Sequence, residues 1–219
     1  MSFILDGYNW DPSDPSSITN LLLAHLTITF WSMVLGLLIA FPIAFIVARY
    51  HRLYLPVITS ADIIYTIPSL ALFAFLIPFT KLSVATLIIP LVLYEQLVLI
   101  RNIVAGVHAV DPALVEVGRA MGMNGRQLQR YVVLPLALPV IVAGIRVAAV
   151  TTIGIAALGP WIGTADLGKL IFDGFNFARE DMIAAGVILV SALAVLVDLL
   201  LLGVQAFLSR GRPVALAAA

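Results

Sequence analysis

Residues 182–208 read MIAAGVILVSALAVLVDLLLLGVQAFL, an apolar stretch that contains a single charge, at Asp198. A helix that crosses the hydrocarbon core of a bilayer needs about 20 consecutive, mostly apolar residues. Four further stretches meet this requirement: 21–48, 56–78, 82–100 and 132–158. The sequence therefore predicts an all-α membrane protein, a polytopic bundle of about five transmembrane helices.

The composition of the whole chain agrees with a membrane environment. Of its residues, 62% are hydrophobic and 11% are charged, and the mean hydropathy is +1.11, which is more apolar than a soluble domain hides in one core. Lys plus Arg and Asp plus Glu both number 12, so the chain lacks the net positive charge that would indicate a nucleic-acid partner. Cysteine is absent, and His25, His51 and His108 do not have the spacing of a metal-ligand set. We expect no metal site and no cofactor bound by this chain.

The basic residues predict the orientation of the bundle, because Lys and Arg concentrate in cytoplasmic loops. With the N-terminus outside, Lys81, Lys169 and Arg179 lie outside and Arg146 lies within a span. The other eight of the 12 basic residues then face the cytoplasm: Arg49, Arg52, Arg101, Arg119, Arg126, Arg130, Arg210 and Arg212. We therefore expect an extracytoplasmic segment at 1–20, one transmembrane domain at 21–208 and a cytoplasmic tail at 209–219.

The cytoplasmic loop at 102–131 has the composition of an amphipathic helical hairpin. Asp111 followed by Pro112 is a helix-start signal, because the Asp oxygen can accept from free amides and Pro needs no amide partner in the first turn. The helix should run over 113–121 and end at Gly122. Its apolar face should carry Leu114, Val117 and Met121, and another face should carry Glu116 and Arg119.

A second helix should start directly after the first. Asn124 is a good N-cap, and Gln127, three residues later, can complete a capping box. Two interpretations of this hairpin are open at this point. It can dock on a partner protein, or it can lie on an anionic lipid surface.

The hairpin resembles the "EAA" loop of binding-protein-dependent ABC importer permeases. The match consists of Glu116-Val117-Gly118, then Gly122, then Val132 and Leu134-Pro135, with Val117 and Gly118 in place of the usual Ala-Ala. In that family this loop forms the coupling helices that dock in a groove of the ATP-binding subunit. The resemblance implies a methionine-importer-like transmembrane fold and assigns ATPase coupling to these residues: Asp111, Glu116, Gly118, Arg119, Gly122, Leu134 and Pro135.

A wider resemblance covers about 67–168 and is to permeases for osmoprotectants such as glycine betaine, carnitine or choline. It rests on the runs IPSLAL at 67–72, VDPAL at 110–114, LPLALPVI at 134–141 and AGIR at 143–146. Such permeases tend to have Ile-Gly-Ala-Gly-Gly-Leu-Gly where this chain has IGTADLG at 162–168. The resemblance implies a quaternary-amine solute. The same architecture importing an amino acid or another small solute is the alternative.

The resemblance also implies the partners. The chain has no Gly-x-x-x-x-Gly-Lys-Ser/Thr phosphate loop, so ATP and Mg are expected on a separate ATP-binding subunit and this chain is not expected to be an enzyme. An extracytoplasmic substrate-binding protein and a second permease, identical or related, complete the expected assembly in a prokaryotic plasma membrane. An ion-coupled secondary transporter is one rival function, and a non-transporting anchor for an ATPase is another.

Polar and aromatic residues inside the spans are candidates for the translocation path or gate. Arg146 lies near mid-depth and needs a carboxylate, which Glu95 or Asp62 could supply. Aromatic side chains in these spans either bind a quaternary ammonium group through cation–π contacts or serve only in packing and at the membrane interface. The candidate path residues are Tyr65, Pro68, Ser69, Phe73, Tyr94, Glu95, Arg146, Thr151 and Thr152. The aromatic outer loop at 159–181 is either an outer gate or an interfacial belt.

Overall fold

The computed structural model describes residues 2–209, which form helices joined by short turns and loops, with no strand in that range. Four helices are long and apolar enough to cross a membrane. They are α2 (Ile18–Arg49), α5 (Val84–His108), α8 (Leu134–Ala156), which continues a helical run from Gly125, and α10 (Glu180–Ser209). The predicted tail residues Arg210 and Arg212 lie outside the described residues.

The remaining predicted span, 56–78, is a bent pair of helices. The 3-10 turn η2 (His51–Leu53) leads into α3 (Tyr54–Thr66), and α4 (Ser69–Thr80) follows at 91° to the preceding run. Pro68 disfavours the α conformation of the residue before it, and Ile67 is extended, with φ −69° and ψ 127°. The Tyr94 hydroxyl donates to the Ile67 carbonyl at 2.8 Å, which holds the break against α5. Counting this pair as one span gives five.

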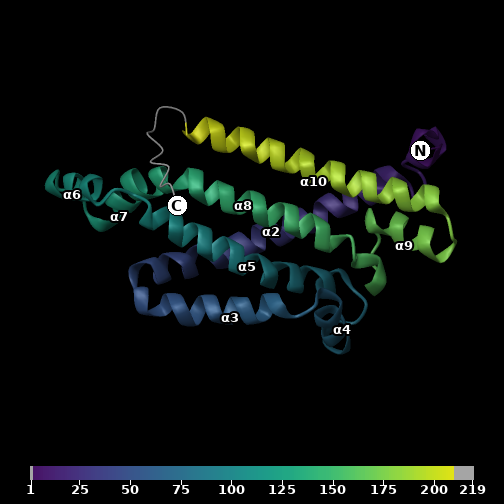
Figure 1. Ribbon diagram of the computed structural model, residues 1–219, viewed down its shortest axis with the longest axis horizontal. Coiled ribbons are helices and arrows are strands. Elements are labelled where there is room, and N and C mark those ends of the chain that lie inside the picture. The colour runs from purple at the N-terminus through teal and green to yellow at the C-terminus, as the bar shows by residue number, and fades with distance from the viewer. Residues whose placement is uncertain (1, 210–219) are drawn as a thin grey trace.

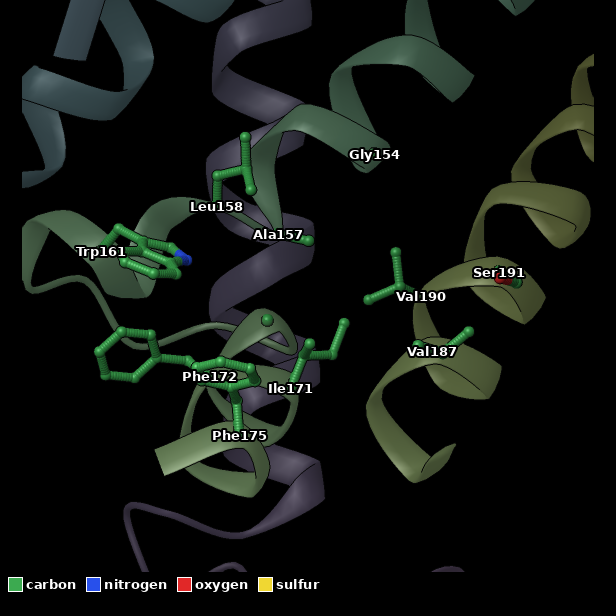
Figure 2. A pocket seen from close by; sticks show the side chains of 11 residues that line it. Gly154, Ala157, Leu158, Trp161, Ile171, Phe172, Phe175, Val187, Val190 and Ser191 are labelled. Atoms are coloured by element: carbon green, nitrogen blue, oxygen red, sulfur yellow. The ribbon is translucent and has the colours of Figure 1, made fainter. Parts of the chain in front are cut away.

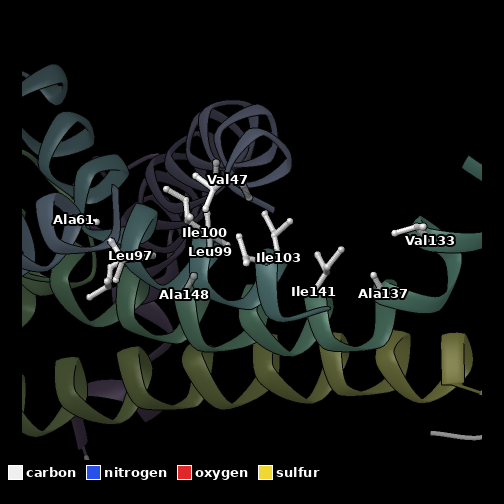
Figure 3. Close-up of a cluster of buried hydrophobic side chains, with 14 of the residues drawn as sticks. Val47, Ala61, Leu97, Leu99, Ile100, Ile103, Val133, Ala137, Ile141 and Ala148 are labelled. Carbon is white, nitrogen blue, oxygen red and sulfur yellow. The ribbon is translucent and has the colours of Figure 1, made fainter. Parts of the chain in front are cut away.

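Helix α5 is the centre of the bundle. In its most apolar window 61% of the residues are buried, against 6% for α10, which lies along α8 at the edge (Figure 1). Figure 3 shows the largest buried cluster, where α5 packs against α2, α8 and α3 through side chains such as Val47, Ile103 and Ile141. Helix α5 extends into the predicted loop 102–131, so the loop proper begins after His108.

The short elements gather at the two ends of the bundle. Helix α1 (Ser2–Leu5), the 3-10 turns η1 (Gly7–Trp10) and η4 (Gly159–Ile162), and α9 (Gly168–Asn176) lie at one end. At the other end α6 (Pro112–Ala120) and α7 (Gly125–Leu128) project beyond the long helices (Figure 1). The predicted outer and cytoplasmic loops therefore lie at opposite ends of the molecule.

Candidate functional site

The predicted hairpin forms, and its first helix starts where the sequence indicates. Asp111 is the N-cap of α6, and its carboxylate accepts from the Ala113 amide at 2.8 Å. Pro112 occupies the first turn, where its missing amide has no helical partner to lose. These contacts give α6 a defined start and confirm the predicted cap.

The end of α6 is equally well defined. Gly122 has φ +81°, in the left-handed region that favours glycine. The Gly122 amide donates to the Arg119 carbonyl at 2.9 Å, and the Met123 amide donates to the Gly118 carbonyl at 3.2 Å. This pair of bonds is the Schellman motif, which satisfies carbonyls left free at the helix end. Gly122 is therefore the predicted C-terminal cap, and it sets the direction in which the chain leaves α6.

The second half of the hairpin begins with the predicted capping box. The Asn124 side chain accepts from the Gln127 amide at 3.0 Å, and the Gln127 side chain accepts from the Asn124 amide at 2.8 Å. A π-helical turn, η3 (Gln129–Val133), then joins α7 to α8. A proline ring clashes with the carbonyl four residues earlier, and for Pro135 that residue lies inside the wide π turn. Leu134 and Pro135 are thus the first two residues of α8, directly after the hairpin.

Gly118 lies where the two halves of the hairpin touch. It is buried, and a Cβ at this position would lie 2.7 Å from Leu128 Cδ1 and 3.4 Å from Met123 Sδ. The sequence predicts a cost in helix propensity at Gly118, and the structure adds a benefit, because the missing side chain lets α6 approach Leu128 closely. Gly118 therefore sets the spacing of the hairpin.

The apolar face of α6 is uncovered by the rest of the chain. Leu114, Val117 and Met121 are 46%, 57% and 72% exposed. Glu116 and Arg119 are also exposed, and within residues 2–209 neither takes part in an ion pair. We call Leu114, Val117 and Met121 the α6 stripe. It is a small apolar surface on a capped, projecting helix, and such a surface suits contact with another protein.

Several candidate path residues converge beside the α3–α4 break. The Tyr65 and Tyr94 rings meet edge-on, with their centroids 5.9 Å apart. Tyr94, Glu95, Thr151 and Thr152 line one small cavity between α5 and α8. Pro68 and Ser69 form the break itself. Phe73 does not join this group, because it is fully buried in a separate hydrophobic cluster with Ile28, Leu87 and Leu91.

Glu95 is the buried acid of this cluster. Glu95 is 3% exposed, and its Oε1 accepts a hydrogen bond from the Thr152 hydroxyl at 2.7 Å. Its Oε2 faces α2 at Gly36, where any side chain would overlap the carboxyl, and it has no hydrogen-bond partner in the described chain. Glu95 therefore lies where α2, α5 and α8 meet.

The predicted partner of Arg146 is wrong. Arg146 binds Asp198 of α10 through two bonds of 2.9 Å and the Gln205 side chain through a third of 2.8 Å. Glu95 instead accepts a hydrogen bond from Thr152. Thr152 lies six residues after Arg146, about 240° around α8, so the two side chains leave the helix in different directions. Asp62 is also occupied, because it binds Arg101 at 2.7 Å. Arg146 thus joins α8 to α10 and does not contact the Tyr94–Glu95 cluster.

The aromatic loop after α8 folds back onto the bundle. An open groove of about 430 Å³ lies between α8, α9 and α10. Figure 2 shows Trp161, Phe172 and Phe175 among the side chains that line it. The Trp161 and Phe172 rings meet edge-on at 5.2 Å. Both predictions for this loop, a gate and an interfacial aromatic belt, are compatible with the groove.

The unusual Asp166 of this loop has a partner that the sequence analysis missed. Asp166 and His25 are both fully buried, and His25 Nδ1 lies 3.5 Å from Asp166 Oδ1. The same carboxylate oxygen accepts from the Gly168 amide at 2.7 Å, while His25 Nε2 lies 3.2 Å from the Ile153 carbonyl. His25 is a lone titratable residue inside a span and Asp166 replaces an expected glycine. Those two signals, taken together, could have indicated the contact.

Comparisons with known proteins agree with this geometry. Residues 18–212 match the family described as binding-protein-dependent transport system inner membrane component. The carnitine transport permease protein OpuCB of Listeria monocytogenes is 40% identical over 174 residues, which cover 80% of each chain. The choline transport system permease protein OpuBB of Bacillus subtilis is 37% identical, covering 81% of this chain and 82% of that relative.

A third relative and a solved structure cover more of the chain. The osmoprotectant import permease protein OsmW of Salmonella typhimurium is 34% identical and covers 88% of this chain and 92% of its own length. An inward-facing structure of the MetNI methionine ABC transporter matches with a TM-score of 0.76 and 25% identity, over 88% of this chain and 96% of that chain. This chain therefore belongs to the family of binding-protein-dependent inner membrane components, the non-catalytic permease subunits of ABC importers.

Proposed function

We propose that this permease carries a small quaternary-amine solute, such as carnitine, choline or glycine betaine, inward across the membrane at the expense of ATP. The proposal rests on the named substrates of the curated relatives. ATP and Mg bind a separate ATPase subunit, and a substrate-binding protein delivers the solute at the outer end. The N-terminus is outside and the hairpin is in the cytoplasm, as the distribution of arginines indicates.

The observation that carries the coupling proposal is the uncovered α6 stripe on a helix with a defined start and end. A helix that is fixed at Asp111 and Gly122 can move as a rigid body and pass that motion to α5 and α8, which it joins. Asp111, Glu116, Gly118, Arg119, Gly122, Leu134 and Pro135 are the proposed coupling residues. Two such hairpins, from this chain and an identical or related permease, would dock on a pair of ATPases.

The proposed path lies along the Tyr65–Tyr94 pair, Glu95 and the Thr151–Thr152 hydroxyls. Aromatic rings attract quaternary ammonium groups, and a buried carboxyl adds affinity for a cation. Phe73 and Arg146 are better explained as packing and as a bridge between helices. An amino acid is the alternative solute, because the structural neighbour is a methionine transporter.

The proposal predicts that one charge on the α6 stripe separates the permease from its ATPase. In Val117→Asp, a carboxylate would have to be buried against the partner, so co-purification of an ATPase subunit and uptake of labelled carnitine, choline and glycine betaine should both fall at least tenfold. Ala120→Asp is the matched control, because it adds the same charge to an exposed position of α6 outside the stripe. It should keep both activities.

Three results would contradict the proposal. Val117→Asp could retain the ATPase and full uptake, which would show that the stripe is not the docking surface. Uptake driven by a proton gradient without ATP would favour the ion-coupled alternative. Uptake of methionine in preference to the three quaternary amines would replace the proposed solute.

A further inference from the structure

A second groove, distinct from the α6 stripe and from the proposed path, opens at the hairpin end of the bundle. Its volume is about 790 Å³. The end of α2, the end of α5 and the segment 124–129, which contains α7, form its walls. The lining residues are Phe45, Ala48, Arg49, Val107, Asn124, Gly125, Arg126 and Gln129. Three segments that are distant in the sequence thus build one concave surface.

The groove is positively charged. Arg49 and Arg126 are exposed, and across residues 2–209 neither has a carboxylate within ion-pair distance. Among the described residues that line the groove, none is acidic. Two nearby acids have other partners: Asp62 forms an ion pair with Arg101, and Asp111 caps α6. The side-chain amides of Asn124 and Gln129 add polar groups beside the two guanidinium groups.

The other wall of the groove is apolar. Phe45 and Ala48 belong to α2 and Val107 belongs to α5, and both helices are long and apolar enough to cross the membrane. Arg49 is the last residue of α2, so it lies where that helix leaves the hydrocarbon under the proposed topology. The groove thus offers cationic donors beside an apolar surface, which matches a molecule with an anionic head and an apolar tail.

We propose that this groove binds the phosphate headgroup of an anionic phospholipid, with Arg49 and Arg126 on the phosphate and the acyl chains against Phe45 and Val107. Arginine suits the role because its planar fork donates two bonds to one phosphate. The ATPase is a poorer occupant, because the α6 stripe does not line the groove. A free phosphate would leave the apolar wall unused.

The test measures lipid affinity of the full-length chain purified in detergent, by native mass spectrometry with dioleoyl phosphatidylglycerol and, separately, dioleoyl phosphatidylcholine. Wild type should bind phosphatidylglycerol more tightly. Each basic residue contributes about fivefold to affinity for an anionic lipid surface, so Arg49→Gln with Arg126→Gln should weaken phosphatidylglycerol binding about 25-fold. Arg49→Lys with Arg126→Lys keeps both charges but loses the planar fork, so its affinity should fall between wild type and the glutamine pair.

The matched control is Arg52→Gln with Arg130→Gln. It removes the same charge from the same end, at two exposed arginines that do not line the groove and that likewise have no ion pair among the described residues. Arg130 even contacts the ring of the next residue, Tyr131, as Arg49 contacts Tyr50. This control should bind phosphatidylglycerol like wild type.

Three outcomes would overturn the proposal. Equal weakening in both glutamine pairs would mean diffuse surface charge. Equal wild-type affinity for phosphatidylcholine would mean an apolar site without headgroup recognition. Competition by glycerol phosphate at the same concentration as the lipid would mean a site for a soluble anion. The assay contains no ATPase and no membrane gradient, so its result is independent of the proposed transport function and topology.

Discussion

At the scale of single residues, the contact between Asp166 and His25 distinguishes this chain from the pattern expected of osmoprotectant permeases. A glycine at position 166 would leave His25 Nδ1 facing no acid. With Asp166, His25 Nδ1 faces a carboxyl group in a fully buried site, and the amide of Gly168 is satisfied as well. One substitution therefore ties the aromatic loop after α8 to the first long helix.

We expect Asp166→Ala to lower the free energy of unfolding by about 1–3 kcal/mol, because it leaves the buried Gly168 amide without its acceptor and His25 Nδ1 without a polar neighbour. Thermal unfolding in detergent measures this. Asp166→Asn keeps an acceptor for the Gly168 amide, so it should fall between wild type and Asp166→Ala.

The control for this prediction is the pair Arg179–Asp181, whose side chains are 50% and 31% exposed. Asp181→Ala should cost less than about 1 kcal/mol, since exposed ion pairs contribute little. Equal losses in Asp166→Ala and Asp181→Ala would mean that the buried contact has no special weight.

At the scale of helices, glycines bring α5 and α8 into close contact. A Cβ at Gly144 would overlap the side chain of Asn102, and one at Gly106 would lie 3.0 Å from the Ala137 carbonyl oxygen. Close approach through small residues is the usual way to pack helices in a membrane, where burial of apolar surface gives little drive. The seam between α5 and α8 therefore depends on these glycines.

Gly144→Ala should destabilise the protein by about 1–3 kcal/mol through overpacking at this seam. Gly154→Ala is the matched control, since it lies in the same helix with nothing within 4 Å of the added Cβ. It should be neutral or stabilise by up to about 1 kcal/mol through helix propensity. Thermal unfolding of the two variants in one detergent makes the comparison, and equal losses would mean that the seam tolerates an extra methyl group.

At the scale of the whole molecule, the two ends of the bundle differ in composition. The hairpin end carries most of the arginines, while the other end carries the aromatic loop, α9 and the N-terminal segment (Figure 1). Such a difference is what the positive-inside rule requires of a protein that is inserted in one orientation.

Single cysteines test this orientation, because the natural chain contains none and gives no background. Ser13→Cys and Phe177→Cys should react with a membrane-impermeant maleimide in intact cells. Ala120→Cys, on the hairpin, should react after the membrane is permeabilised. Labelling of Ala120→Cys in intact cells would reverse the topology and remove the basis for ATPase docking.

Much of the hairpin could be predicted from sequence, because its start and end depend on contacts between near neighbours. Asp111, Gly122 and the Asn124–Gln127 pair each act within a few residues, so their types and spacing are sufficient. The existence of the membrane helices was predictable for a similar reason, since length and apolarity are local properties. The coupling and path roles of these residues stay predictions.

The sequence by itself determined the class of the protein, its apolar helices and the caps of its hairpin. Tertiary structure alone decided that Arg146 binds Asp198 and not Glu95, and that Asp166 meets His25. The physical reason is the range of the forces involved. Helix formation and capping act over a few residues, whereas the partner of a buried charge depends on which helix faces turn toward each other when the bundle packs.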